Sequence, residues 1–498
     1  MLVNGQPNFV SIVTDDQGPW ALGCAGNTEI VTPNLDRLAE QGIRCDRFFA
    51  TSPVCSPARA SLLTGLVPSQ HGVHDFIREG HVSSARIEYL ARFRGITKYL
   101  TDVGYECALS GKWHLGASDV PQQGFAHWYA LEGGSSDYNH ARMYRGSRLV
   151  EEEEYLTDLI ADDAIGYLRS RTSSSPFYLA VHFTAPHHPW IGQHPPELLG
   201  LYEECAFDTC PQEKPYHPWG PSSLYAENRA AIRNPRPNLQ GYFAAVTGVD
   251  RAVGRIVETL KALGLMGSTV VMFTSDNGYN CGHHGIWGKG NGTFPQNMYE
   301  ESVRVPLIIY HPDAQRTGIV VDDLLSGYDV FPTVADWAGI ELPEETDERR
   351  AGTSFANRVL GTDEERTRDH VVVCSEYGPV RMIRSDSWKL VKRYPFGPDE
   401  LYDLSADPKE RDNLAGDGGV AAKHLRELES ELVGWFARYS DVYRDGSRMP
   451  VTGIGQRQVV GKEYSSSLAF YPPEWYDYPV QNLQRFPAAD YPGSQVRQ

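Results

Sequence analysis

The feature that most constrains the fold is a repeated alternation of strand-length apolar runs with helix-length amphipathic stretches. The runs at 9–13, 177–183 and 269–274 are rich in β-branched and aromatic residues, as buried parallel strands are. Apolar residues at helical spacing over 241–263 predict a helix before the last of these strands. This order predicts an α/β fold in which helices cover both faces of a large, mostly parallel sheet.

Other local signals continue the pattern. A helix is predicted from Thr32 and Pro33 to Gly42, because Pro is favoured in the first turn and Gly at the end of helices. Residues 303–310 predict a further strand, and residues 328–337 a further helix.

The chain changes character near residue 370. Short apolar runs at hairpin spacing, and then a helical pattern over 420–438, predict a small C-terminal α+β subdomain built on a short antiparallel sheet. The runs lie at 371–373, 380–383, 388–391 and 400–404.

We therefore expect three parts, at 1–369, 370–440 and 441–498. The last is rich in Pro, Tyr and Gln, and we expect an extended tail that wraps the protein or forms contacts in a homo-oligomer. The Pro-rich stretch 186–237 is a long insertion of the kind that often supplies binding loops.

Composition excludes several classes of protein. The 498 residues are enough for about three domains, or for one large α/β domain with an appendage. A formal net charge of −18 argues against a general nucleic-acid or anionic-membrane surface, and no apolar run is long enough to span a membrane. The start of the chain has no signal-peptide pattern and the eight cysteines are scattered, so we expect a cytoplasmic protein, or a periplasmic or secreted one if a signal was removed.

Oxygen-bearing side chains follow two of the predicted strands. Asp15 and Asp16 follow the first, and Asp276 and Asn277 follow the strand at 269–274. Ligands of open parallel sheets bind beyond the carboxyl ends of the strands, and such oxygens suit Ca²⁺ or Mg²⁺. Either pair alone could be an ordinary turn, but two pairs at matching positions favour a metal site.

The most specific motif is CSPARASLLTG at residues 55–65. Cys55 precedes a helical pattern, so its side chain would lie at the positive end of the helix dipole. Arg59 is one turn further on the same face and could hold an oxyanion formed at position 55. An isolated cysteine is more often simply buried, and an isolated arginine is more often on the surface.

Four more residues could supply cations and proton carriers. Lys112 and His114 would share one face of an extended segment, and His187 follows the strand at 177–183. Lys289 lies in a Gly-flanked loop beyond Asp276. His188 and His194 leave the choice of histidine open.

Several further residues are weaker candidates. His283 and His284 are expected to line the pocket, and Cys205 and Cys210 are close enough in sequence that their pairing stays open. Three aromatic residues suit stacking on sugar or aryl rings, namely Trp128, Tyr129 and Trp190. Three others could contact a substrate, namely Ser135, Ser136 and Tyr138.

From Asp15 to about Asn413 the chain resembles the type I sulfatases of the alkaline-phosphatase superfamily. Besides the motif at 55–65, the resemblance rests on segments 111–116, 186–189, 276–278, 288–290, 301–306 and 401–414. It implies that Cys55 is oxidised to formylglycine by a formylglycine-generating enzyme. It also implies that Asp15, Asp16, Asp276, Asn277 and the modified residue 55 bind Ca²⁺ rather than Mg²⁺.

The resemblance further implies a role for each catalytic residue. The metal, Arg59 and the helix dipole would activate the hydrated aldehyde at position 55 for attack on sulfur. Lys112, Lys289 and His187 would bind the sulfate, with His187, alone or together with Lys289, protonating the leaving oxygen. His114 would then take the proton from the remaining hydroxyl, which expels sulfate and restores the aldehyde.

The expected activity is therefore hydrolysis of a sulfate ester, on a sulfated sugar or a small organic sulfate. One alternative is a phosphonate monoester or phosphodiester hydrolase with the same nucleophile. The other is a non-catalytic homologue that only binds.

Overall fold

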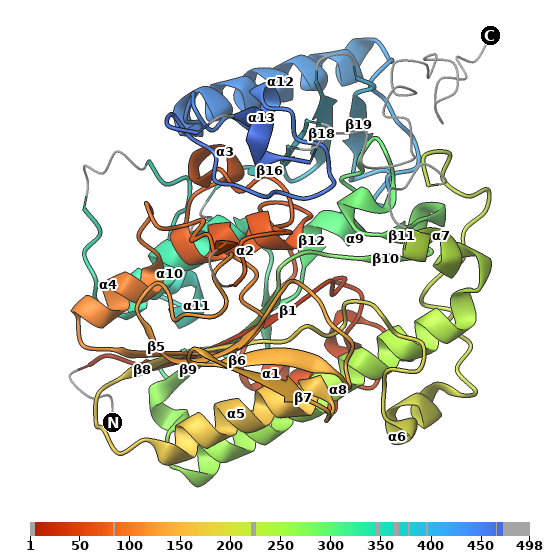
Figure 1. Cartoon of the computed structure of the whole chain (residues 1–498). Helices are drawn as coiled ribbons and strands as arrows, with labels where there is room; N and C mark the ends of the chain where they lie inside the picture. Colours follow the sequence, from red (N-terminus) through yellow and green to blue (C-terminus); the bar gives the residue numbers. More distant parts are fainter. Residues whose placement is uncertain are drawn as a thin grey trace.

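The core of the protein is a ten-stranded mixed sheet, seen edge-on in Figure 1. This computed structural model describes residues 5–471, except 83–84, 221–225, 344–348, 363–365, 367, 377–378, 395–396 and 465. Five parallel strands form the centre of the sheet: β9 (Thr269–Ser275), β1 (Asn8–Thr14), β8 (Phe177–His182), β4 (Glu106–Gly111) and β5 (Phe125–Leu131). The predicted α/β fold is confirmed, and the runs predicted as parallel strands form three of the central five.

The flanks of the sheet give it its mixed character. On one side lie β13 (Leu307–Tyr310), β2 (Ile43–Cys45) and β14 (Ile319–Val321), and on the other β6 (Ala141–Arg145) and β7 (Arg148–Glu152). β13 runs antiparallel to β9, and β6 antiparallel to β5. Antiparallel edge strands are common on otherwise parallel sheets.

One predicted strand is divided. Residues 303–310 contain the end of α9 (Glu300–Val303), the two-residue β12 (Arg304–Val305) and β13. Pro306 separates β12 from β13, and because proline has no N–H to donate it interrupts the pairing. β12 joins a separate small sheet with β3 (Phe48–Phe49) and β15 (Leu325–Ser326).

Helices cover both faces of the sheet (Figure 1). One layer contains α1 (Pro33–Gln41), α5 (Leu156–Ser170) and α8 (Pro235–Ala262). The other contains α2 (Cys55–Thr64), α4 (Ile96–Asp102), α10 (Val330–Trp337) and α11 (Ala356–Leu360). Val10 and Ile12 of β1 pack with the first layer and Phe9 with the second, so both faces of this strand are buried.

The C-terminal elements form the predicted antiparallel sheet. Its strands are β16 (Val371–Ser375), β17 (Val380–Arg384), β18 (Trp388–Arg393) and β19 (Glu400–Asp403). α12 (Gly419–Tyr439) packs on this sheet through Leu428, Leu432 and Phe436. The division of the chain into three domains stays a prediction.

The first part of the predicted tail returns to the main body. Arg78 N–H donates to Gln456 O at 2.9 Å, and Gln456 N–H donates to Phe76 O at 2.8 Å. Gln456 is fully buried there, and its side-chain oxygen accepts from His74 N–H. The tail therefore supports the segment at 74–78, and residues 472–498 lie outside the described part.

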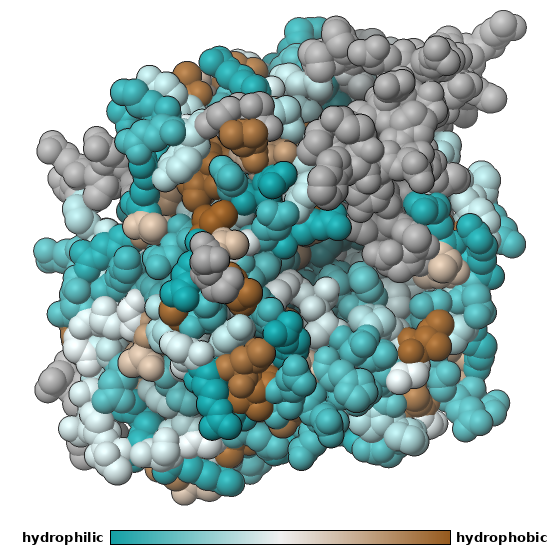
Figure 2. All heavy atoms as spheres, viewed as in Figure 1, coloured by the Kyte–Doolittle hydropathy of each residue, from teal (hydrophilic) through white to brown (hydrophobic). Residues whose placement is uncertain are grey.

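The structure also bears on cysteine pairing, which the sequence left open, and on membrane spans. All eight cysteines are free thiols, so Cys205 and Cys210 do not pair. No helix among the described residues is long and apolar enough to cross a bilayer. Figure 2 shows a mostly hydrophilic face on which hydrophobic residues gather only in small patches.

Asp75, beside this returning tail, predicts a pH dependence of stability. Burial raises the pKa of its carboxyl from 3.8 to about 7, although Gly455 and Phe76 donate backbone hydrogen bonds to it. Between these values the folded protein keeps a proton that the unfolded chain has lost, so the free energy of unfolding falls as pH rises.

Asp75→Asn removes this titration. We expect the unfolding free energy to fall less steeply for the variant than for the wild type between pH 4 and 7, as measured by urea denaturation. A difference between the two proteins that stays constant over this range would contradict the prediction.

Candidate active site

The two acidic segments meet at one edge of the sheet. β1 and β9 pair in parallel and end side by side, which brings Asp15, Asp16, Asp276 and Asn277 together. Asn277 Nδ2 donates to Asp16 Oδ1 at 2.7 Å, and Asp16 N–H donates to Asp276 Oδ1 at 3.4 Å. All four side chains are buried.

Two oxygens of this group have no hydrogen-bond donor. They are Asp15 Oδ1 and Asn277 Oδ1, both buried, and neither has a partner within the described structure. Unsatisfied buried acceptors are costly, and carboxylate and amide oxygens are the ligands that Ca²⁺ and Mg²⁺ prefer. Ligand atoms of Asp15, Asp16 and His187 also lie within 4.8 Å of one another. The residues therefore fit a divalent cation.

Basic side chains contact one further oxygen of each carboxylate in the group. Lys112 Nζ forms an ion pair with Asp15, and Lys289 Nζ lies 2.5 Å from Asp16 Oδ1. Burial alone would raise the pKa of Asp15, but Lys112 and other nearby cations hold it well below its ordinary value. Burial, reinforced by the charge of Asp15, raises the pKa of Asp276 to about 6.

Cys55 faces this cluster from the first residue of α2. The N-cap residue Val54 makes no side-chain hydrogen bond to the first turn of the helix, so the positive end of α2 is open beside Cys55. Burial raises the pKa of the Cys55 thiol above its ordinary value, despite nearby Lys112 and Lys289. As an unmodified thiol this residue is therefore a poor nucleophile at neutral pH.

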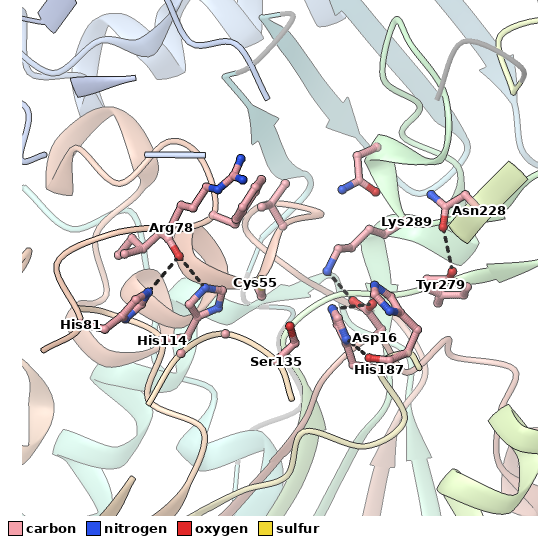
Figure 3. Close-up of a pocket in the computed structure, with 17 residues that line it drawn as sticks. Asp16, Cys55, Arg78, His81, His114, Ser135, His187, Asn228, Tyr279 and Lys289 are labelled. Carbon is pink, nitrogen blue, oxygen red and sulfur yellow. Dashed lines mark hydrogen bonds and ion pairs between the residues drawn. The ribbon is translucent and has the colours of Figure 1, made fainter. Parts of the chain in front are cut away.

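A cavity of about 350 Å³ opens over Cys55. Figure 3 shows Cys55 between two groups of side chains in this view. One group is Asp16, His187 and Lys289, and the other is Arg78, His81 and His114.

Arg59 contacts the cluster without lining the cavity. Its Nε donates to Asp276 Oδ2 at 2.8 Å and its Nη1 to Lys112 O at 3.0 Å. Its side chain is only 3% exposed and does not line the cavity. Arg59 therefore orients a candidate metal ligand in this structure, and its predicted contact with an oxyanion stays a prediction.

The structure holds His114 as a neutral imidazole. The segment is not extended here, because the backbone of His114 has φ 55°, in the left-handed region. Its Nε2–H donates to Ile77 O at 3.0 Å, which leaves Nδ1 as a buried lone pair with no hydrogen-bond partner in the described structure. Burial, with the charge of Lys112, lowers the pKa of His114 well below its ordinary value, so the imidazole is neutral at pH 7.

His187 is held through Nδ1, the ring nitrogen that His114 leaves unbonded. Its Nδ1–H donates to the carbonyl of His188 at 2.6 Å, so Nε2 is the atom that can exchange a proton. Nε2 lies 3.7 Å from Asp16 Oδ2. Burial lowers the pKa of His187 to about 4, against the opposing charge of Asp15. Tyr138 supports the same loop by donating its hydroxyl to His187 O at 2.7 Å.

The weaker candidates divide into two sets. Ser135 and His188 line the cavity, whereas His283 and His284 do not, so their predicted place in the pocket is wrong. His284 instead pairs with Glu301 at 3.0 Å. The aromatic residues expected to stack on a substrate are buried in the core, namely Trp128, Tyr129 and Trp190.

Other lining residues were not predicted. They are Val54, Phe76, Ile77, Arg78, His81, Gly133, Gly134, Asn228, Tyr279 and Asn291. Asn228 is on α7 (Ala226–Arg233), within the insertion at 186–237 that was predicted to supply binding loops. That general prediction is the sequence signal that could have pointed to Asn228. The others come from loops whose positions depend on long-range packing.

Comparison with known proteins identifies the family. The family model described as Sulfatase matches residues 7–340, and the C-terminal model of N-sulphoglucosamine sulphohydrolase matches residues 282–435. The chain belongs to the sulfatase family. It is a type I sulfatase of the alkaline-phosphatase superfamily and a sulfuric ester hydrolase.

Individual relatives agree with this assignment. The sulfatase is 28% identical to an N-acetylglucosamine-6-O-sulfatase of Bacteroides thetaiotaomicron, over 88% of this chain and 87% of that protein. It is 30% identical to an ulvan-active sulfatase of Formosa agariphila, over 88% and 83%. It is also 30% identical to a choline-sulfatase of Rhizobium meliloti, over 83% of each chain.

Solved structures agree on the fold. A protein in complex with its substrate D-glucosamine-2-N,6-O-disulfate matches with a TM-score of 0.72 and 26% identity, over 88% of this chain and 99% of that one. The phosphonate monoester hydrolase of Agrobacterium radiobacter matches with a TM-score of 0.69 and 22% identity, over 87% and 96%. At that identity, the second likeness shows the fold alone.

Gly134 generates a prediction for this sulfatase. A Cβ at Gly134 would lie 2.2 Å from His114 Nε2 and would push the imidazole away from Ile77 O. Gly134→Ala should therefore lower kcat for a sulfate ester by about tenfold to a hundredfold.

Gly133 provides the matched control. A Cβ at Gly133 meets no atom within 4 Å, so Gly133→Ala should have a much smaller effect. Equal kcat values for the two alanine variants, in proteins with the same melting temperature, would contradict the prediction.

Proposed function

We propose that this sulfatase hydrolyses the sulfate ester of a sulfated saccharide with a formylglycine nucleophile made from Cys55 and a bound Ca²⁺. The observation that carries the proposal is the position of Cys55. It lies at the open N-terminus of α2, in one cavity with Asp16, Lys289, His187 and His114.

The metal would be held by Asp15, Asp16, Asp276, Asn277 and the modified residue 55. The two unpartnered oxygens, on Asp15 and Asn277, support this assignment. When bound, the cation supplies positive charge that polarises the nucleophile and a sulfate oxygen. Ca²⁺ accepts a larger and more flexible set of oxygen ligands than Mg²⁺ does.

The protein's own residues would bind the sulfate and move protons. Lys289 faces the cavity and Lys112 lies beside Asp15, so both add positive charge where the transferred group gains negative charge. His187 Nε2, the ring nitrogen left free by the bond to His188 O, is neutral at pH 7 and would first take up a proton, which it would then pass to the leaving oxygen. His114 Nδ1, which has no partner in the described structure, would accept the proton that releases sulfate.

A saccharide substrate is supported by the relatives. One bears the name of a sugar-6-O-sulfatase, and one solved structure holds a disulfated glucosamine. Maturation by a formylglycine-generating enzyme belongs to the same proposal. Cytoplasmic location and contacts between copies through the tail stay predictions.

Turnover of paired aryl substrates tests the proposal. The chain, co-produced with a formylglycine-generating enzyme, should show a higher kcat/KM for 4-nitrophenyl sulfate than for the phenylphosphonate monoester of 4-nitrophenol. A preference for the phosphonate would instead favour the alternative hydrolase.

Mass spectrometry of the peptide with Cys55 is the control for maturation. Conversion to formylglycine lowers the mass of this peptide by about 18 Da. A converted protein that hydrolyses no sulfate ester would contradict the proposed function.

A further inference from the structure

A second cavity adjoins the catalytic one. It has a volume of about 610 Å³, and four residues line both cavities, namely Arg78, His81, Gly133 and Ser135. A ligand whose sulfate reaches Cys55 can therefore extend past these four residues, which we call the seam. None of the seam residues is acidic, and Arg78 is its only permanently charged member.

The charge of Arg78 is available to a ligand. Its side chain is exposed and, among the described residues, forms no ion pair with a carboxylate. Arg142, which also lines the second cavity, differs because its Nε pairs with Glu132 at 3.0 Å. An arginine left without a carboxylate between two cavities is placed to bind an anion.

The C-terminal segment holds Arg78 in place. Its Nη1 donates to Ile454 O at 3.3 Å, and its guanidinium carbon lies 5.1 Å from the ring centroid of Tyr471. Neither contact neutralises the positive charge of Arg78, because one partner is a carbonyl oxygen and the other is an aromatic ring.

The close approach of the C-terminal segment to the segment that carries Arg78 depends on Gly455. A Cβ at Gly455 would lie 2.9 Å from Arg78 Cβ. The backbone of Gly455 also has φ +117°, which residues other than glycine rarely adopt. The backbone pairing of Gln456 with Phe76 and Arg78 then fixes the base of the arginine.

We propose that Arg78 binds a second anionic group, a sulfate or a carboxylate, on the saccharide that carries the scissile sulfate. The inference rests on the proposed function, because it describes how the same substrate extends from the catalytic cavity. The planar guanidinium fork matches the paired oxygens of both anions. The same positive charge disfavours a cationic leaving group at the seam.

A binding measurement tests this inference without relying on catalytic turnover. The full chain with Cys55→Ala serves as the parent, so that the ligand is not consumed during calorimetric titration. Three probes are used: N-acetylglucosamine 6-sulfate, glucosamine 2-N,6-O-disulfate, and 6-sulfated N-acetylglucosamine joined to a uronic acid. The disulfate reports recognition of a second sulfate, and the uronic acid reports recognition of a carboxylate.

The parent should bind at least one doubly charged probe more tightly than the monosulfate. Adding Arg78→Ala should weaken that probe by about tenfold or more relative to the monosulfate. Arg78→Gln, which keeps a polar side chain without the positive charge, should show the same loss of preference.

Arg457 provides the matched control. It also lies over the Tyr471 ring, 5.1 Å from its centroid, and its Nε lies 3.8 Å from Glu79, but it lines neither cavity. Arg457→Ala removes the same charge from the same aromatic contact and should keep the preference of the parent.

Two results would overturn the inference: a parent without preference for either doubly charged probe, or Arg78 variants that weaken all three probes equally. Sulfate release by the unsubstituted, converted chain is measured separately. Its absence would count against the proposed function, whereas the binding preference tests Arg78 alone.

Discussion

The proposed catalytic centre depends on an incomplete set of buried contacts around four oxygen-bearing side chains. Lys112, Lys289 and Arg59 each occupy an oxygen of one of the carboxylates, yet Asp15 Oδ1 and Asn277 Oδ1 have no donor in the described structure. Both oxygens are buried, so leaving them without a partner is costly, and a bound cation would remove that cost. The arrangement fits a metal site in which each of the three carboxylates already pairs with a basic side chain.

The fold assembles this centre from distant segments. Parallel strands β1 and β9 deliver the acidic residues, and the N-terminus of α2 delivers Cys55 with the positive end of its dipole. β4 and β8 deliver Lys112 and His187 just beyond their carboxyl ends. The sheet is rigid because both its faces are buried, and a rigid support suits a site that must hold several charges in register.

Local signals explain what could be predicted from the sequence. The apolar runs of β1, β8 and β9 are buried on both faces and therefore read as continuous strands, and the acidic pairs follow directly after two of them. Residues whose role depends on long-range packing were not predictable. Arg78 and His81 carry no motif, and the distant tail around Gln456 pairs with the backbone of Phe76 and Arg78 in the segment that leads to them.

The errors have a similar origin. Trp128 and Trp190 were expected at a substrate, but their indole N–H groups donate to Ser118 O and Pro186 O within the core. An aromatic residue beside a motif carries no local signal that distinguishes packing from ligand binding. His114 was expected in an extended segment, and only the structure reveals its left-handed backbone.

Direct titration of the metal-free chain with Ca²⁺ by calorimetry tests the central claim most simply. The account predicts one ion bound per chain, and affinity more than about tenfold weaker in Asn277→Ala, which lacks one of the two donor-free oxygens. Absence of binding, or equal binding by the variant, would contradict it.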